Sequence, residues 1–119
     1  MRDRLDVLKA LADESRLRAL CALRNGELCV CQLIALLELA PSTVSKHLSL
    51  LRAARLVDSR KEGRWMYYTL SQKFRATSTG KILALLFKDL DGTDRIIADG
   101  KRLKVICGEN MDSLCRRIL

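Results

Sequence analysis

Two short stretches with apolar residues at helical spacing, separated by a tight turn, constrain the fold of this chain more than any other feature. The first covers residues 30–37, and in the second Val44, Leu48 and Leu51 share one face at i, i+4 and i+7. The turn between them ends at Pro41, which suits the first position of a helix because its missing N–H would have no partner there. Two short helices joined in this way form a helix-turn-helix, which we predict over about residues 29–54.

A β-hairpin follows, predicted over about residues 56–70. Two stretches that favour strands flank Glu62-Gly63, and a glycine-containing loop is typical of a hairpin. Side chains alternate across a strand, so we expect Met66, Tyr68 and Leu70 to face the core and Trp65, Tyr67 and Thr69 to face away. A helix-turn-helix with a basic hairpin is a winged helix, so the expected fold class is mainly α with a β-hairpin wing.

The rest of the chain is predicted to be helical and to make a dimer. Apolar residues at helical spacing predict helices over about residues 3–12 and from residue 14 to Asn25-Gly26. They also predict two helices within about 80–106, the first running to Asp91-Gly92 and the second beginning near Thr93. These residues exceed what a small winged helix needs for its own core. We therefore expect one domain over 1–119 and a homodimer through residues 3–12 and 80–106. The tail, residues 107–119, has no clear expected order.

Charge and composition narrow the class of partner. The chain of 119 residues has a formal net charge of +8, and residues 51–81 carry eight Lys or Arg against two Asp or Glu. Such a local excess indicates contact with a polyanion. No apolar run approaches the ~18 residues that span a bilayer, and the first residues lack a signal-peptide core, so a cytoplasmic protein is expected. Five cysteines are then more often reduced than bridged.

The expected partner is double-stranded DNA, and a two-fold dimer predicts a binding site that is an imperfect palindrome. The polar face of the second helix of the helix-turn-helix should contact bases and backbone, and the hairpin should contact phosphates or the minor groove. His47, the only histidine, lies at the edge of the apolar face, where packing or a phosphate contact is expected. The candidate DNA contacts are Ser42, Thr43, Ser45, Lys46, His47, Ser49, Arg60, Lys61 and Arg64.

Cys29-Val30-Cys31 places two soft ligands at the start of the helix-turn-helix. Residues two apart on a regular helix point to opposite sides, so we expect chelation of one atom only if the helix start unwinds. Thiolates select soft partners, arsenite and antimonite among them. Trivalent arsenic prefers three thiolates, so a third donor would be needed, and Cys107 and Cys115 are candidates, from either subunit or as a separate site of their own. Cys107 could equally pack in a core. Cys115, beside two arginines in the tail, should be an exposed and reactive thiol, whereas Cys21 should be buried.

Three signatures together resemble the ArsR/SmtB family of winged-helix metalloregulatory repressors. They are Leu11-Ala12-Asp13-Glu14-Ser15-Arg16-Leu17, Glu27-Leu28-Cys29-Val30-Cys31-Gln32-Leu33, and the pair Ser42–Leu48 and Glu62–Tyr68. The resemblance implies a homodimer that represses an operon and leaves DNA when a metal or metalloid binds. The cysteine signature is closest to the arsenite-responsive members, which implies As(III) or Sb(III) as inducer and no organic cofactor. It departs from them at Ile34, where a third cysteine is common, and at Gln32, where Asp is common.

Two alternatives stay open. The same repressor could respond to a divalent soft metal (Cd, Pb or Zn) or to thiol oxidation. Zinc sensors in the family use His and carboxylates on the last helix, and residues 82–119 contain no histidine, which argues against that kind of zinc site. An enzyme is disfavoured, because the sequence offers no nucleophile–base pair and no phosphate loop. A thiol oxidoreductase would usually have Cys-x-x-Cys.

Overall fold

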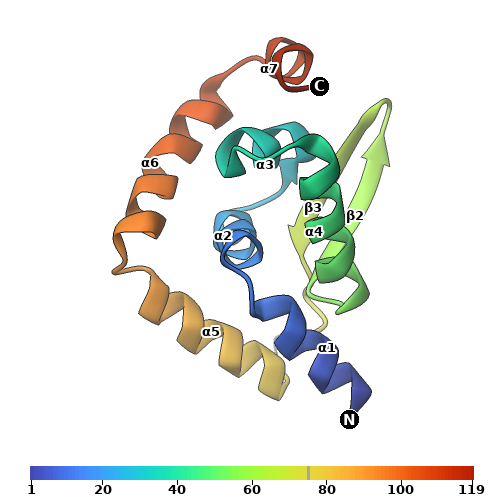
Figure 1. Ribbon diagram of the computed structural model, residues 1–119, viewed down its shortest axis with the longest axis vertical. Helices are drawn as coiled ribbons and strands as arrows, with labels where there is room; N and C mark the ends of the chain where they lie inside the picture. Colours follow the sequence, from blue (N-terminus) through green and yellow to red (C-terminus); the bar gives the residue numbers. More distant parts are fainter. Residues whose placement is uncertain (75) are drawn as a thin grey trace.

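The computed structural model describes residues 1–74 and 76–119 and shows a winged helix enclosed on one side by its C-terminal helices (Figure 1). The elements in chain order are α1 (Arg2–Leu11), α2 (Glu14–Leu23), β1 (Leu28–Cys29), α3 (Val30–Leu37), α4 (Pro41–Ala53), β2 (Val57–Glu62), β3 (Trp65–Leu70), α5 (Ser78–Leu90), α6 (Asp94–Gly108) and α7 (Met111–Ile118). The predicted helix-turn-helix is α3 and α4, and the predicted hairpin is β2 and β3. Within the described residues, no helix is long and apolar enough to cross a membrane.

The core is made by the helices of the helix-turn-helix unit and the sheet behind them. Leu20 and Leu23 of α2, Leu33 and Leu36 of α3, and Leu48 of α4 are almost completely buried together. Burying each such side chain contributes about 1.5–3 kcal/mol relative to leaving it exposed. The apolar stripes that predicted the helices are therefore also the surfaces that hold α2, α3 and α4 together.

The sheet contains a short strand that the sequence did not predict. The strand order is β1-β3-β2, all antiparallel, with Leu28 opposite Tyr68 and Cys29 opposite Tyr67. β3 therefore lies in the middle, and each of its residues is half-buried. The predicted alternation along β3 is wrong in this respect, because Trp65 and Tyr67 pack against the core as Tyr68 and Leu70 do.

The C-terminal helices form an arc around the winged helix (Figure 1). α6 packs on α2 and α3, and α7 turns back to lie on α3. Residues 107–119, for which no order was expected, thus form the end of α6 and all of α7. α1 and α5 keep large apolar side chains on the outside, with Leu8 55% and Leu85 70% exposed.

Candidate metal centre and nucleic-acid interface

Three cysteine side chains meet at one buried point. The sulfur atoms of Cys29, Cys31 and Cys115 all lie within 4.8 Å of one another. Cys29 and Cys31 are fully buried and Cys115 is 8% exposed. Cys31 and Cys115 are paired as a disulfide with Cα atoms 5.4 Å apart, while Cys29 is free. We call these three residues the thiol cluster; they come from β1, α3 and α7.

The junction of β1 and α3 lets Cys29 and Cys31 face the same point. Cys29 has extended backbone angles (φ −72°, ψ 150°) and precedes the first residue of α3, so the two cysteines are not on one regular helix. The side-chain oxygen of Gln32 accepts a hydrogen bond of 2.9 Å from the Cys29 N–H, which fixes this junction. The expectation that α3 must unwind is therefore wrong: the change from strand to helix already lies between the two thiols.

Cys115 reaches the cluster because α7 has one apolar face. Leu114 and Cys115 are buried, and Met111 and Ile118 pack against the core at the same helical spacing. The side chain of Asn110 caps the helix by accepting a 3.2 Å hydrogen bond from the Ser113 N–H. The expectation of an exposed Cys115 in the tail is thus wrong, because the tail folds and buries the thiol.

The remaining cysteines lie outside the thiol cluster. Cys107 is exposed on α6 and joins neither the core nor the cluster. Neighbouring atoms still desolvate its sulfur enough to raise the pKa of the thiol. Cys21 is buried, as predicted, and its burial raises the pKa of its thiol. Of the four candidate ligands, the structure brings three together and leaves Cys107 apart.

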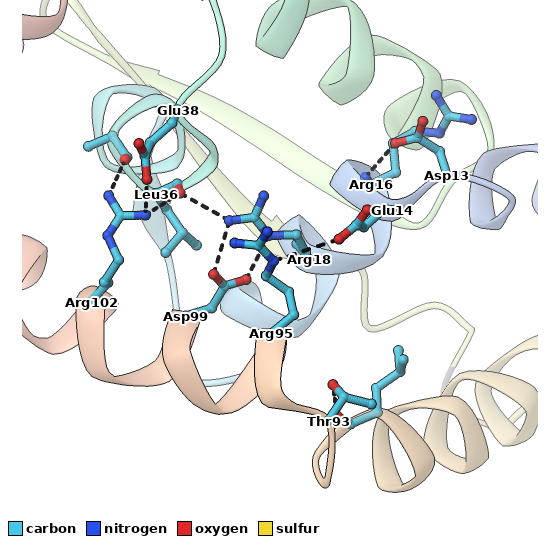
Figure 2. Close-up of polar contacts among 12 residues, drawn as sticks. Asp13, Glu14, Arg16, Arg18, Leu36, Glu38, Thr93, Arg95, Asp99 and Arg102 are labelled. Atoms are coloured by element: carbon cyan, nitrogen blue, oxygen red, sulfur yellow. Dashed lines mark hydrogen bonds and ion pairs between the residues drawn. The ribbon is translucent and has the colours of Figure 1, made fainter.

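A buried polar network holds the opposite end of α3 (Figure 2). Arg18 of α2 makes two hydrogen bonds of 2.8 and 3.0 Å to Asp99 of α6 and donates to the carbonyl of Leu36 at 3.2 Å. Arg102 of α6 donates to the same carbonyl and to that of Ala35, both at 2.8 Å. The bond to Asp99 raises the pKa of the Arg18 guanidinium. Two cations thus satisfy the last carbonyls of α3.

The outward face of α4 is polar and open. Val44, Leu48 and Leu51 point into the core, as predicted. His47 differs from its neighbours on this helix, because it is half-buried and its Nδ1 lies 3.1 Å from Nη1 of Arg16 at the start of α2. The predicted contacts Ser42, Thr43, Ser45, Lys46 and Ser49 are all exposed on α4.

The basic residues of the hairpin differ in what they contact. Arg60 binds both carboxylate oxygens of Glu27 at 2.7 Å, reaches Glu62 at 2.9 Å and stacks on Tyr67. This pairing lowers the pKa of the Glu27 carboxyl. Arg64, at the tip, is 75% exposed and donates a 2.9 Å hydrogen bond to Asp112 of α7. The sequence alone gave no signal for the roles of Glu27, Asp99 or Asp112, because each depends on a partner remote in the chain.

A helix-turn-helix with an open polar second helix and a basic wing defines a winged-helix regulator of transcription. The family model described as "Bacterial regulatory protein, arsR family" matches residues 13–59. The arsenic resistance transcriptional regulator ArsR2 of Pseudomonas putida is 34% identical over 113 residues, which cover 92% of this chain and 95% of ArsR2. The chain belongs to the arsR family of bacterial regulatory proteins.

Other relatives match over a shorter length. ArsR1 of the same organism, also an arsenic resistance transcriptional regulator, is 48% identical over 65 residues, 54% of this chain and 51% of its own length. Among solved structures, HlyU from Vibrio cholerae is similar with a TM-score of 0.63 and 40% identity, over 73% of this chain and 90% of HlyU. The homodimeric winged helix-turn-helix domain of Mb0332 from Mycobacterium bovis is similar with a TM-score of 0.63 and 27% identity, over 78% and 86%.

Proposed function

We propose that this protein is a transcriptional repressor that leaves its operator when trivalent arsenic or antimony binds the thiol cluster. The observation that carries the proposal is the convergence of Cys29, Cys31 and Cys115 within 4.8 Å at a buried point. Thiolates select soft ions, and a three-sulfur set suits trivalent arsenic. The arsenic-resistance regulators among the relatives support the same inducer.

Binding of trivalent arsenic by three thiols needs no oxidant. Arsenous acid, As(OH)₃, exchanges three As–O bonds for three As–S bonds, and the three thiol protons leave with the hydroxyls as three water molecules. Arsenic stays trivalent throughout. Cys31 and Cys115 must both be reduced before this exchange, so the cluster binds the metalloid only in a reducing environment.

For DNA binding, we assign the exposed face of α4 to the major groove and the wing to the backbone. Two copies of α4, one from each subunit of a homodimer, would read the half-sites of an imperfect palindrome. The outward apolar residues Leu5, Leu8, Ile82 and Leu85 of α1 and α5 are available for that dimer, and the homodimeric Mb0332 domain supports it. The proposed ligand set consists of Cys29, Cys31 and Cys115, and Cys107 lies apart from it, exposed on α6.

A second candidate signal is thiol oxidation. The Cys31–Cys115 pairing supports it, because the two sulfurs are placed to bond across α3 and α7. In that reaction each thiol loses a proton, and two electrons pass to an oxidant such as diamide. Oxidation and metalloid binding then compete for the same two sulfur atoms, so the two signals would exclude each other.

Fluorescence anisotropy of a labelled duplex from the promoter of its own operon tests the proposal. Protein kept reduced with a phosphine should bind the duplex and leave it on addition of arsenite or antimonite. The variants Cys29→Ser, Cys31→Ser and Cys115→Ser should still bind DNA but fail to leave it. Cys107→Ser is the matched control, a thiol outside the cluster, and should behave as wild type.

The outcomes separate the candidate signals. Release by cadmium, lead or zinc but not by arsenite would replace the metalloid with a divalent soft metal. Release only by diamide, after the phosphine is removed, would favour oxidation. If the three serine variants released DNA normally with arsenite, the assignment of the cluster would be wrong.

A further inference from the structure

We infer that helix α7 is the moving part of the sensor, and that inducer bound at the thiol cluster locks it in a position where it withholds Arg64 of the wing from DNA. This inference rests on the proposed function, because it takes the cluster as the inducer site. It adds a route from the metalloid to the DNA-binding surface. The route is a contact between α7 and the wing that competes directly with DNA.

Helix α7 touches the thiol cluster and the wing with residues one helical turn apart. Cys115 contributes its buried sulfur to the cluster, and Asp112, three residues earlier, accepts a 2.9 Å hydrogen bond from Arg64. Residues three apart on a helix lie on neighbouring positions of its surface. Any ligand that fixes Cys115 therefore also fixes the carboxylate of Asp112 beside the wing tip.

The docking of α7 depends on tertiary contacts. The helix has eight residues, and isolated helices this short are unstable in water. Its contacts to the rest of the chain include the apolar face around Leu114, the disulfide of Cys115 with Cys31, and the ion pairs of Asp112 with Arg64 and of Arg117 with Glu109. Reduction of the disulfide leaves only the non-covalent contacts. A metalloid held by Cys29 and Cys31 gains its third sulfur only when α7 is docked. The ligand thus binds the docked state more tightly, which is the condition for shifting the equilibrium.

Arg64 cannot bind Asp112 and a DNA phosphate at the same time. It is 75% exposed at the tip of the wing, where a basic side chain can reach a phosphate. When paired with Asp112, its guanidinium faces a carboxylate, and α7 adds that negative charge next to the DNA path. One exposed ion pair contributes little by itself. A dimer has two, however, and each docked α7 removes one cation from the DNA contact.

The test compares Asp112→Asn with Glu109→Gln as the matched control. Glu109 is a carboxylate of the same C-terminal segment whose ion pair, at 3.0 Å, is with Arg117 and not with a residue of the wing. Dissociation constants for the labelled duplex are measured with and without arsenite. Asp112→Asn should diminish the arsenite-induced loss of DNA affinity by about threefold to tenfold, since up to two phosphate contacts per dimer are restored. Glu109→Gln and Asp112→Glu should respond as wild type.

Two readouts make the result specific. Titration of free thiols should show that one arsenite protects three thiols in Asp112→Asn as in wild type, so that inducer binding and the docking of Cys115 are intact. The salt dependence of DNA binding in the presence of arsenite should be steeper for Asp112→Asn than for wild type, because Arg64 has returned to a phosphate.

The failures are distinguishable. If arsenite protects three thiols in Asp112→Asn and releases it from DNA as fully as wild type, the inferred role of α7 in withholding Arg64 is refuted while the proposed function stands. Loss of release in Glu109→Gln to the same degree also refutes it, because the effect is then one of tail charge. If arsenite protects no thiols in the wild-type protein, the proposed function is refuted, and the inference about α7 is refuted with it.

Discussion

The buried ion pair between Arg18 and Asp99 yields the sharpest stability prediction. Both side chains are about nine-tenths covered, at 10% and 9% exposure, and two short hydrogen bonds join them. Asp99→Ala removes the carboxylate and leaves a buried guanidinium whose remaining acceptor is the Leu36 carbonyl. Breaking a buried pair in this way destabilises a protein by about 3–5 kcal/mol.

That loss is large relative to the whole stability of a domain, which is about 5–15 kcal/mol. Urea unfolding followed by circular dichroism should show this loss of stability. The protein concentration must be the same for every variant, because the unfolding midpoint of a dimer depends on concentration. The matched control is Asp91→Ala, which removes the exposed carboxylate that pairs with Arg24. We expect this control to unfold close to wild type.

A second variant separates the charge from the packing. Arg18→Met combined with Asp99→Leu removes both charges and keeps apolar volume, so most of the lost stability should return. The double variant should therefore be more stable than Asp99→Ala. If Asp99→Ala unfolded within about 1 kcal/mol of wild type, the pair would be solvated in solution and the reasoning from its burial would be refuted.

Three further predictions follow from the contacts of individual side chains. Arg60 holds the pKa of the Glu27 carboxyl below its ordinary value of 4.5, so the stabilisation by this pair should be present above pH 4.5 and disappear as the pH falls through the lowered pKa. The melting temperatures of wild type and Glu27→Gln should therefore differ slightly at pH 7 and converge in acid. A difference that stays constant with pH would contradict this. In the reduced protein, iodoacetamide should modify Cys107 before Cys21, because Cys107 is exposed and Cys21 is buried. Mass spectrometry of digests would give the order of modification, and faster labelling of Cys21 would contradict the packing of α2 and α6. Lys46→Ala should reduce the salt slope of DNA binding by about one to two per dimer if each Lys46 contacts a phosphate, and an unchanged slope would remove Lys46 from that contact.

The helix-turn-helix and the wing were predictable because their signals are local. Helical spacing identifies α3 and α4, Pro41 marks the start of α4, and Gly63 takes the positive φ of 61° that the hairpin loop needs. The outer face of α4 is exposed as expected. What the sequence did not predict is β1, because a strand of two residues has no periodicity to detect.

The thiol cluster was predictable in composition but not in geometry. Cys29 and Cys31 were expected to act together, and Cys115 was one of two candidate third donors. Choosing Cys115 over Cys107 requires knowing that residues 111–118 form a docked helix, and so short a helix is stabilised by its tertiary contacts and not by local propensity. The expected unwinding of α3 was wrong because Cys29 ends strand β1 and α3 begins at Val30, so the backbone already changes direction between Cys29 and Cys31.

The way α3 is held explains why the inducer signal should pass through α7 and not through α3. At its start, the Gln32 side chain and the pairing of β1 with β3 fix Cys29. At its end, Arg18 and Arg102 bind its last carbonyls. A helix held at both ends resists a shift when a metalloid binds at its first turn. The third donor, Cys115, lies on a short terminal helix. Once the disulfide between Cys31 and Cys115 is reduced, α7 is held by one apolar face and by ion pairs of exposed side chains, so we expect α7 to move more easily than α3.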